Sequence, residues 1–189
     1  DHNVEQHVHS LDKAQWILGD GAPIAATGLG GRQVRTEDKW GHIFDHHAVV
    51  YEYPNNVRMH AYTRQQAGCF NQTEDFIFGT KGVCQVLKHE IAKPNGEVMW
   101  KYSGPKPSMY QVEHNELFQS IRDGKPINNG AYMAMSTMVA IMGRMATYSG
   151  QRVTWDDAFN SSVDLTPATY TWGDVPTPPV AMPGITREV

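Results

Sequence analysis

Two β-rich runs that meet at a tight turn constrain the fold more than any other feature of the sequence. The runs are DHHAVVYEYP and VRMHAYTRQQ, and Pro54-Asn55-Asn56 joins them. Alternating apolar and β-branched residues favour strands, while proline and asparagine favour turns. The sequence therefore predicts an antiparallel hairpin here.

Further strands and several helices are predicted on either side of this hairpin. Apolar residues recur at intervals of three and four from Val4 to Leu18, and Gly19 is a natural helix stop. PIAATGLG precedes the hairpin as a strand, and TEDFIFGT, VCQVLKHEI and EVMWKY follow it. MYQVEHNELFQSIRDGKP and NNGAYMAMSTMVAIMGRMATYSG have helical character, and Thr154 is the expected N-cap of a short helix in WDDAF. The predicted fold class is α+β, an open, mainly antiparallel sheet of six or more strands with helices packed on one face.

The length of 189 residues suits one domain, which we expect to span residues 1–165. Residues 166–189 are rich in proline and threonine and are expected to form an extended tail. Both faces of the predicted sheet are partly apolar, which favours a homo-oligomer, a dimer or tetramer, that forms through the open face. Along one strand the two faces carry Val49, Tyr51 and Tyr53 on one side and Ala48, Val50 and Glu52 on the other.

Composition and charge exclude several classes of partner. The formal net charge is -4, without long runs of one sign, so no nucleic-acid or anionic-lipid partner is expected. No stretch approaches the roughly 18 to 20 apolar residues of a membrane span. Cys69 and Cys84 form neither a disulfide framework nor a zinc motif. The sequence leaves the localisation open, either cytoplasmic or, with an export signal further upstream, periplasmic.

The strongest chemical candidates lie in the first predicted helix. Glu5, His9 and Asp12 stand at i, i+4 and i+7, which places them on one helix face. A carboxylate beside an imidazole favours its charged form, and such a histidine can exchange a proton with a hydroxyl or carbonyl group. The alternative is an ordinary solvated face with an i, i+4 pair. His7 and His9 diverge on a helix, and no later pair has a zinc-ligand spacing, so no metal site is predicted.

A glycine-rich loop, from Gly28 to about Phe44, supplies further polar candidates. GLGGRQ lacks the GxGxxG spacing before a helix that a dinucleotide site needs. Its glycines either provide a turn with positive φ or direct Arg32 and Gln33 toward a polar substrate. Together with Tyr62 and Arg64, these residues could line a polar cleft beside His9. The methionines of the long helix are expected to fill the core.

The segment VEQHVHSLDKAQWILG resembles the start of the C-terminal domain in the family of glucose-fructose oxidoreductase, inositol dehydrogenase and MocA (Gfo/Idh/MocA). That pattern reads acid, three residues, histidine, two residues, aspartate, then Trp-hydrophobic-Leu-Gly. Glu5, His9, Asp12 and Trp16-Ile17-Leu18-Gly19 occupy its positions. The resemblance extends to about residue 160. The later segments that carry it resemble a bacterial subgroup of the family, and they are GGRQVRT, DHHAVVYEYPNNVR, FIFGTKGVCQV, EHNELFQSIRDGKPINN and MVAIMGRMATYSGQRVTWDDA.

The resemblance implies a C-terminal domain like that of glyceraldehyde-3-phosphate dehydrogenase, in a two-domain enzyme whose N-terminal Rossmann domain is absent from this chain. It implies NAD or NADP as cofactor, a sugar or polyol as substrate, and His9 as the acid/base with Glu5 beside it. Asp12, Arg32, Gln33, Tyr62 and Arg64 are expected to bind substrate, and the chain alone is expected to be inactive. Two alternatives stay open. One is an NAD-dependent glycoside hydrolase of the same fold, and the other is a non-catalytic assembly module.

Overall fold

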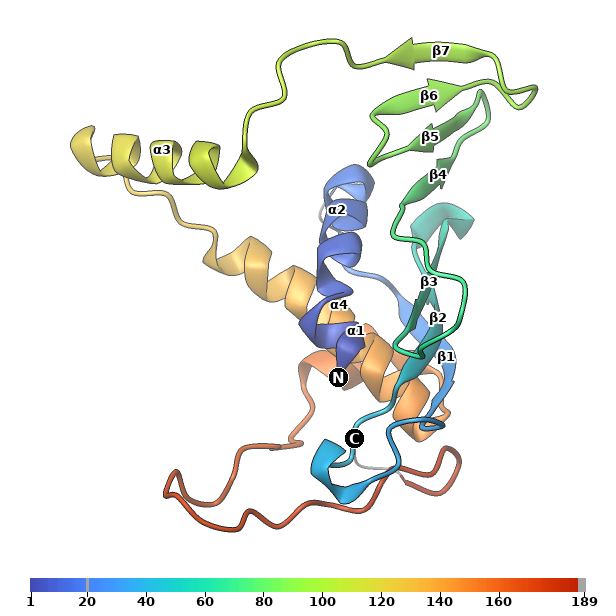
Figure 1. The fold of residues 1–189 in the computed structure, drawn as a ribbon, viewed down its shortest axis with the longest axis vertical. Helices are drawn as coiled ribbons and strands as arrows, with labels where there is room; N and C mark the ends of the chain where they lie inside the picture. Colours follow the sequence, from blue (N-terminus) through green and yellow to red (C-terminus); the bar gives the residue numbers. More distant parts are fainter. Residues whose placement is uncertain (20, 187–189) are drawn as a thin grey trace. The chain divides into compact units, whose positions relative to one another are not determined.

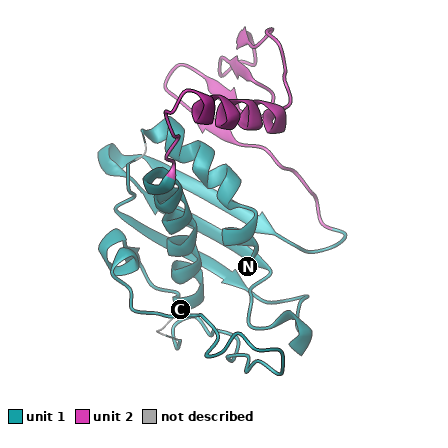
Figure 2. Ribbon diagram, turned by 90° about the vertical axis from the view of Figure 1, so that its left-hand side faces the viewer, with its two compact units in different colours: residues 1–68, 130–189 teal, residues 69–129 magenta. Residues whose placement is uncertain are grey.

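The computed structural model describes residues 1–19 and 21–186, which form two compact units (Figures 1 and 2). Unit 1 contains Asp1–Gly68 and the chain from Gly130 onward, and unit 2 is Cys69–Asn129. The predicted domain 1–165 thus contains all of unit 2 and most of unit 1. Residues 160–186, which include the predicted tail as far as Thr186, contain no helix or strand, and residues 187–189 of that tail lie outside the described residues. In the described part of the chain, no helix has the length and apolarity needed to cross a bilayer.

Unit 1 is built on an antiparallel sheet with the strand order β3-β2-β1-β8. The hairpin of β2 and β3 pairs His46 with Arg64 and Glu52 with Arg58, so this prediction is confirmed. In the turn that joins them, Asn55 has a φ of 59°, a left-handed conformation that asparagine tolerates well. The strands are β1 (Ala25–Gly31), β2 (His46–Glu52), β3 (Arg58–Arg64) and β8 (Val153–Thr154).

Unit 2 holds a second antiparallel sheet and one helix, α3 (Met109–Arg122). The predicted single sheet of six or more strands is therefore wrong, because the eight strands of the described residues divide into two sheets of four. Among the described residues no ladder joins β3 to the next strand, and the chain from 65 to 75 that connects them contains no strand. Strand order in this sheet follows the sequence, with β4 (Phe76–Phe78), β5 (Val83–Gln85), β6 (Glu90–Ala92) and β7 (Val98–Lys101).

Helices cover one face of the sheet in unit 1. The longest, α4, packs against β1 and β2, and α1 and α2 pack against α4 (Figure 1). Thr154 caps α5 as predicted, because its hydroxyl accepts the backbone N–H of Asp157 and the Asp157 carboxylate accepts the N–H of Thr154. The helices are α1 (His2–Glu5), α2 (Val8–Leu18), α4 (Gly130–Ser149) and α5 (Trp155–Phe159), and a 3-10 turn spans Asp38–Trp40.

The predicted continuous helix from Val4 to Leu18 is wrong, because it is divided into α1 and α2. The Asn3 side chain donates to the carbonyl of Ala140 on α4, 2.9 Å away, and its oxygen lies 3.3 Å from Nδ1 of His7. These contacts fix α1 on α4, while the backbone N–H of His7 bonds five residues back to His2. The sequence holds no glycine or proline here, so a tertiary contact sets the break.

The core of unit 1 lies between α4 and the helix-facing side of the sheet. Val49 and Tyr51 from β2 and Val139 and Met142 from α4 are fully buried, and Leu11 closes the core from α2. The methionines of the long helix α4 fill the core only in part, since Met142 is buried while Met133 at the start of α4 is 61% exposed.

The glycines of GLGG lie inside β1 rather than in a loop. None of the three has a positive φ, so they do not form the predicted turn. A Cβ at Gly28 would lie 2.8 Å from Cγ2 of Thr147, and one at Gly30 would lie 3.1 Å from Cβ of Thr147. Their function is close packing, because only glycine lets α4 approach β1 this closely.

Candidate functional site

His9 and Glu5, the residues predicted to be catalytic, are both exposed. Glu5 is the last residue of α1, whereas His9 lies in the first turn of α2. The break between the helices removes the regular i, i+4 spacing on which the predicted pair depended. Of the three residues that were predicted to share one helix face, only His9 and Asp12 lie in the same helix, α2, and keep their helical spacing.

Asp12 is engaged within the chain. One carboxylate oxygen accepts the hydroxyl of Tyr132 at 2.7 Å, and the other accepts the hydroxyl of Ser136 at 2.6 Å. Both donors lie on α4, so Asp12 fixes α2 to α4 one turn after His9. This geometry makes Asp12 a positioning residue for the helix that carries His9, rather than a side chain that is open to substrate.

Arg32 and Gln33 begin a loop that a single carboxylate organises. Oδ2 of Asp45 accepts the backbone N–H groups of Gln33, Val34 and Arg35 at 2.7 to 3.0 Å, and Oδ1 lies 2.8 Å from Nδ1 of His46. Burial alone would raise the pKa of Asp45, but these bonds outweigh it and hold that pKa well below its usual range.

The side chains of Arg32 and Gln33 are held differently. The guanidinium of Arg32 donates to the carbonyls of Gly41 and Glu37, so it closes its own loop. The exposed Gln33 accepts from the amide of Gln66 at 3.2 Å and remains accessible at the surface. Of the two, only Gln33 presents its side chain outward.

Tyr62 and Arg64 do not share a face with the helices. On β3 the buried residue Ala61 faces the core, so Tyr62 and Arg64 project from the opposite side of the sheet. Since α1, α2 and α4 lie on the core side, the structure does not place these two residues in one cleft with His9.

A buried polar cluster between β2, α1 and α4 was not among the predicted site residues. Nδ1 of His47 lies 3.0 Å from the hydroxyl of Thr147, and its Nε2 lies 3.7 Å from Oδ2 of Asp1. Burial lowers the pKa of His47 to about 3, so the imidazole is neutral at pH 7 and this approach is not an ion pair. Asp1 also accepts the backbone N–H of Asn3, which caps α1.

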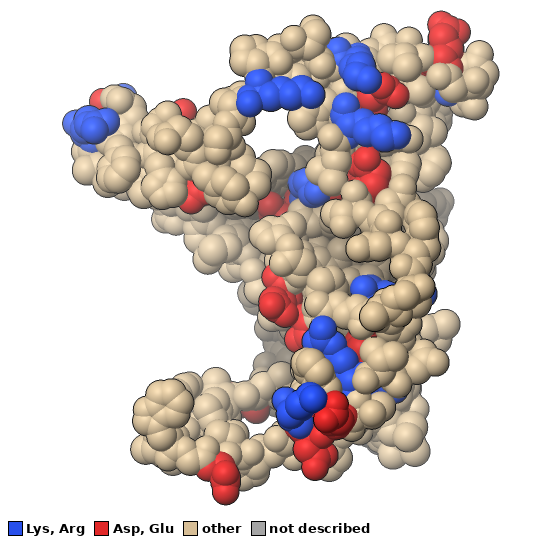
Figure 3. All heavy atoms as spheres, in the orientation of Figure 1, with Lys and Arg blue, Asp and Glu red and all other residues tan. Residues whose placement is uncertain are grey.

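Arg144 extends this cluster toward the surface. Its Nε lies 3.7 Å from Oδ2 of Asp1, and its guanidinium stacks 4.1 Å from the ring of Tyr148, whose hydroxyl accepts the N–H of Phe44 at 2.8 Å. One sequence signal pointed to it, since Arg144 is the only charged residue in α4. On the face drawn in Figure 3, acidic and basic side chains are interspersed.

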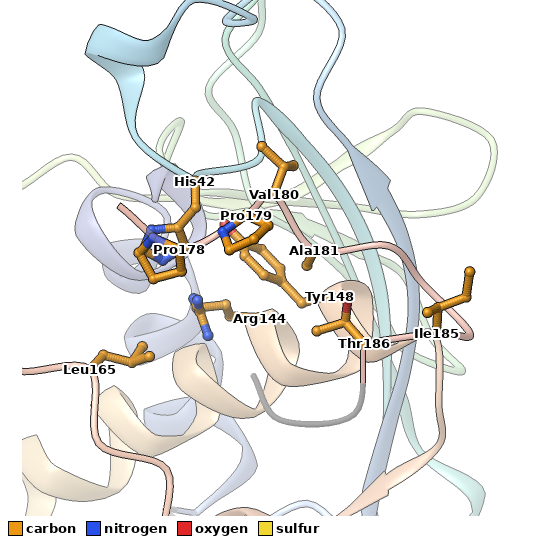
Figure 4. Close-up of a pocket in the computed structure, with 10 residues that line it drawn as sticks. All are labelled: His42, Arg144, Tyr148, Leu165, Pro178, Pro179, Val180, Ala181, Ile185 and Thr186. Atoms are coloured by element: carbon orange, nitrogen blue, oxygen red, sulfur yellow. The ribbon is translucent and has the colours of Figure 1, made fainter. Parts of the chain in front are cut away.

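Arg144 opens into a cavity of about 550 Å³ (Figure 4). His42 and Tyr148 line it from the body of unit 1, and the segment after α5 forms its remaining wall. None of the predicted site residues lines this cavity. Within the described ranges, no three histidine, cysteine or acidic side chains come together in a way that could hold a metal ion.

No protein-family model and no curated protein matches the sequence. Solved structures do match. The aldose-aldose oxidoreductase from Caulobacter crescentus, in complex with glycerol, has a TM-score of 0.60 and 18% identity over 78% of this chain and 45% of its own. An oxidoreductase from Agrobacterium radiobacter, in complex with NAD+, L-tartaric acid and magnesium, has a TM-score of 0.55 and 16% identity over 80% and 48%.

A protein from Desulfitobacterium hafniense, assigned as an NADPH-dependent oxidoreductase, has a TM-score of 0.63 and 15% identity over 81% of this chain and 47% of its own. The chain therefore spans about half the length of the solved oxidoreductases that it matches. The resemblance in the sequence is confirmed at the level of the fold, and the chain shares its fold with about half of an oxidoreductase of this kind.

Proposed function

We propose that the chain is the substrate-binding half of an NAD(P)-dependent oxidoreductase that acts on a sugar, polyol or related hydroxylated compound. The observation that carries the proposal is the fold shared with about half of several oxidoreductases. The complex of one of them with glycerol supports a polyhydroxylated substrate class.

In this proposal His9 is the acid/base. It lies exposed on α2, and the bonds from Asp12 to Tyr132 and Ser136 keep that helix in place on α4. An exposed imidazole on an anchored helix can accept the proton of a substrate hydroxyl during oxidation and return it during reduction. Glu5, at the end of α1, supports the charged imidazolium if it comes near His9 when substrate is bound.

The cofactor is assigned to the part of the parent protein that this sequence does not contain. A dinucleotide site needs glycines between a strand and a helix N-terminus, so that backbone N–H groups meet the pyrophosphate. Here Gly28, Gly30 and Gly31 lie within β1 and face α4 or the neighbouring strand. This glycine segment therefore does not fit a pyrophosphate, and the chain's own proposed contribution is to bind the substrate and move its proton.

We further propose that the open face of the sheet in unit 1 forms a contact between two copies of the chain. Leu29 is 80% exposed and Tyr62 is 67% exposed, and both are in register with Ala48 on β2. Tyr62 and Arg64 then serve assembly rather than substrate binding. This contact is compatible with the oxidoreductase function and is also what a pure assembly module would need.

The decisive experiment uses the intact gene product. Native mass spectrometry, followed by denaturation, is expected to find a chain about twice as long that carries NAD or NADP. Formation of reduced cofactor is then measured at 340 nm with a panel of sugars and polyols. His9→Ala is expected to lower kcat by about 100-fold or more with a small change in KM. The matched control is His114→Ala, which removes an exposed histidine from α3 in unit 2.

Turnover of His9→Ala within a few-fold of the wild type would show that His9 is not the acid/base. Release of free sugar without net reduction of the cofactor would favour the glycoside hydrolase. An intact chain of about 189 residues that binds no nucleotide would favour the assembly module.

A further inference from the structure

Arg144 carries a buried charge whose only ion-pair partner among the described residues is Asp1. The residue is only 8% exposed. Its nearest carboxylate oxygen, Oδ2 of Asp1, lies 3.7 Å from Nε, beyond hydrogen-bond distance. Among the described residues, no carboxylate or carbonyl accepts a hydrogen bond from its terminal nitrogens, which line the cavity beside Tyr148 (Figure 4), and the side chain of Tyr148 is their one hydrogen-bond partner. A guanidinium has five N–H donors, so donors remain for an acceptor from outside the protein.

The remaining wall of the cavity is apolar and is held in place. Gly184 donates its N–H to the carbonyl of Ser149 at 2.7 Å, and the N–H of Met182 bonds to the hydroxyl of Thr186 at 2.8 Å. Ala181 packs against Phe44 and Tyr148. The segment after α5 is therefore fastened to the end of α4. The apolar groups that it presents to the cavity are those of Leu165, Pro178, Pro179, Val180, Ala181 and Ile185.

From these two features we propose that the cavity binds a small organic carboxylate with an apolar body. The planar guanidinium of Arg144 matches a carboxylate and can bond both of its oxygens. The proline and aliphatic side chains are suited to a hydrocarbon or aromatic group. A volume of about 550 Å³ lies within the range of sites for small molecules. An inorganic phosphate or sulfate would leave this apolar wall without a partner.

His42 gives the site a second polar group. It lines the same cavity, and burial, followed by the nearby charge of Arg144, lowers its pKa. A neutral imidazole can donate one hydrogen bond without adding charge. Since neither His9 nor Glu5 lines the cavity, this ligand is a second molecule and is distinct from the proposed hydroxylated substrate.

The test is calorimetric titration of the full 189-residue chain with sodium benzoate at pH 7, and with benzamide as the neutral analogue of the same shape. Benzoate is expected to bind, and benzamide to bind at least about tenfold more weakly. Arg144→Gln is expected to weaken benzoate binding by at least about tenfold, while circular dichroism confirms that the variant is folded. Absence of benzoate binding to the wild type, or equal affinities for benzoate and benzamide, would overturn the proposal.

A second pair of variants leaves Arg144 in place, in case its replacement disturbs the fold. Leu165→Asp puts a negative charge at the cavity wall and is expected to weaken benzoate binding by about fivefold. Val163→Asp makes the same change two residues away, outside the cavity, and is expected to leave the affinity unchanged. Equal effects of the two variants would contradict the assigned site.

The chain could also supply its own anion, since Glu188 follows the described residues in the sequence. A chain that ends at Thr186 separates this case from the proposal. Benzoate affinity within a few-fold of the wild type supports a ligand from outside the protein. If benzoate binds to the shortened chain but not to the wild type, Arg144 has an internal partner and the proposal fails.

Discussion

Gly143, in the middle of α4, is expected to tolerate no side chain because Tyr51 occupies the space beside it. A Cβ built there would overlap the Tyr51 hydroxyl oxygen and would lie 3.0 Å from its Cζ and 3.1 Å from Nδ2 of Asn3. Tyr51 is fully buried in β2, so the ring cannot move aside without disturbing the core. The close approach of β2 to α4 thus depends on this glycine.

Two opposing effects determine the magnitude of Gly143→Ala. Alanine in a helix interior is about 1 kcal/mol more favourable than glycine. Overpacking a filled core costs about 1 to 3 kcal/mol, and the overlap with a buried ring favours the upper end. We therefore expect a net loss of about 2 kcal/mol in the free energy of unfolding, or about 4 to 8 °C in Tm. Urea and thermal unfolding followed by circular dichroism measure both quantities.

Tyr51→Phe separates the overlap from other effects. It removes the overlapping oxygen, which has no hydrogen-bond partner in the described structure, so the single variant should change the free energy of unfolding by less than about 1 kcal/mol. In this background, Gly143→Ala should cost less than about 1 kcal/mol, which gives a coupling of about 1 to 2 kcal/mol. Ala134→Gly, on the exposed side of α4, measures how much the exchange of alanine and glycine changes the free energy of unfolding through helix propensity alone. A stabilising Gly143→Ala, or an equal cost in both backgrounds, would refute the reasoning.

Three further predictions concern stability. The pKa of His47 is about 3 in the folded chain and about 6.5 when unfolded, so the unfolded state takes up the proton first as pH falls. The free energy of unfolding measured with urea should therefore decrease by about 2 kcal/mol between pH 7 and pH 5. His47→Gln should remove most of this loss, and an unchanged dependence of stability on pH in that variant would contradict the assignment. Thr154→Ala removes the hydroxyl that accepts the N–H of Asp157 at the start of α5 and should cost about 1 kcal/mol, whereas Thr169→Ala in the exposed segment should cost nothing; equal costs would count against the cap. Asp45→Asn should cost about 2 to 3 kcal/mol because it weakens three charge-assisted bonds, with the exposed Asp38→Asn as control, and a cost below about 0.5 kcal/mol would show that the loop does not depend on this charge.

Local features of this chain could be predicted from the sequence, because the residues that form them are neighbours. The turn at Pro54-Asn55-Asn56 and the cap at Thr154 are both present at the predicted positions. Each depends on a few adjacent residues whose conformational preferences are strong. The long helix α4 and the exposed helix α3 are likewise found where their patterns indicated.

Features that depend on distant contacts could not be predicted. The division into two sheets is a matter of which strands pair, and no strand pattern encodes its partner. The break between α1 and α2 follows from the bond of Asn3 to Ala140, and the carboxylate of Asp12 is used by two hydroxyls on α4. In the last two cases the deciding residues are more than 100 positions apart. The same distance hid Arg144, because the cavity exists only where the final segment returns to α4.

The pairing of β8 with β1 also determines when the protein can fold during synthesis. Val153 pairs with Ala26, so the sheet of unit 1 cannot be completed until the ribosome has made the whole of α4 and the residues of β8 after it. Unit 2, by contrast, is continuous in sequence, and its strands pair only with their neighbours along the chain. Local pairing forms faster than pairing over long loops. We expect the sheet of unit 2 to be completed first, while the sheet of β1 to β3 keeps one edge unpaired until β8 has been made.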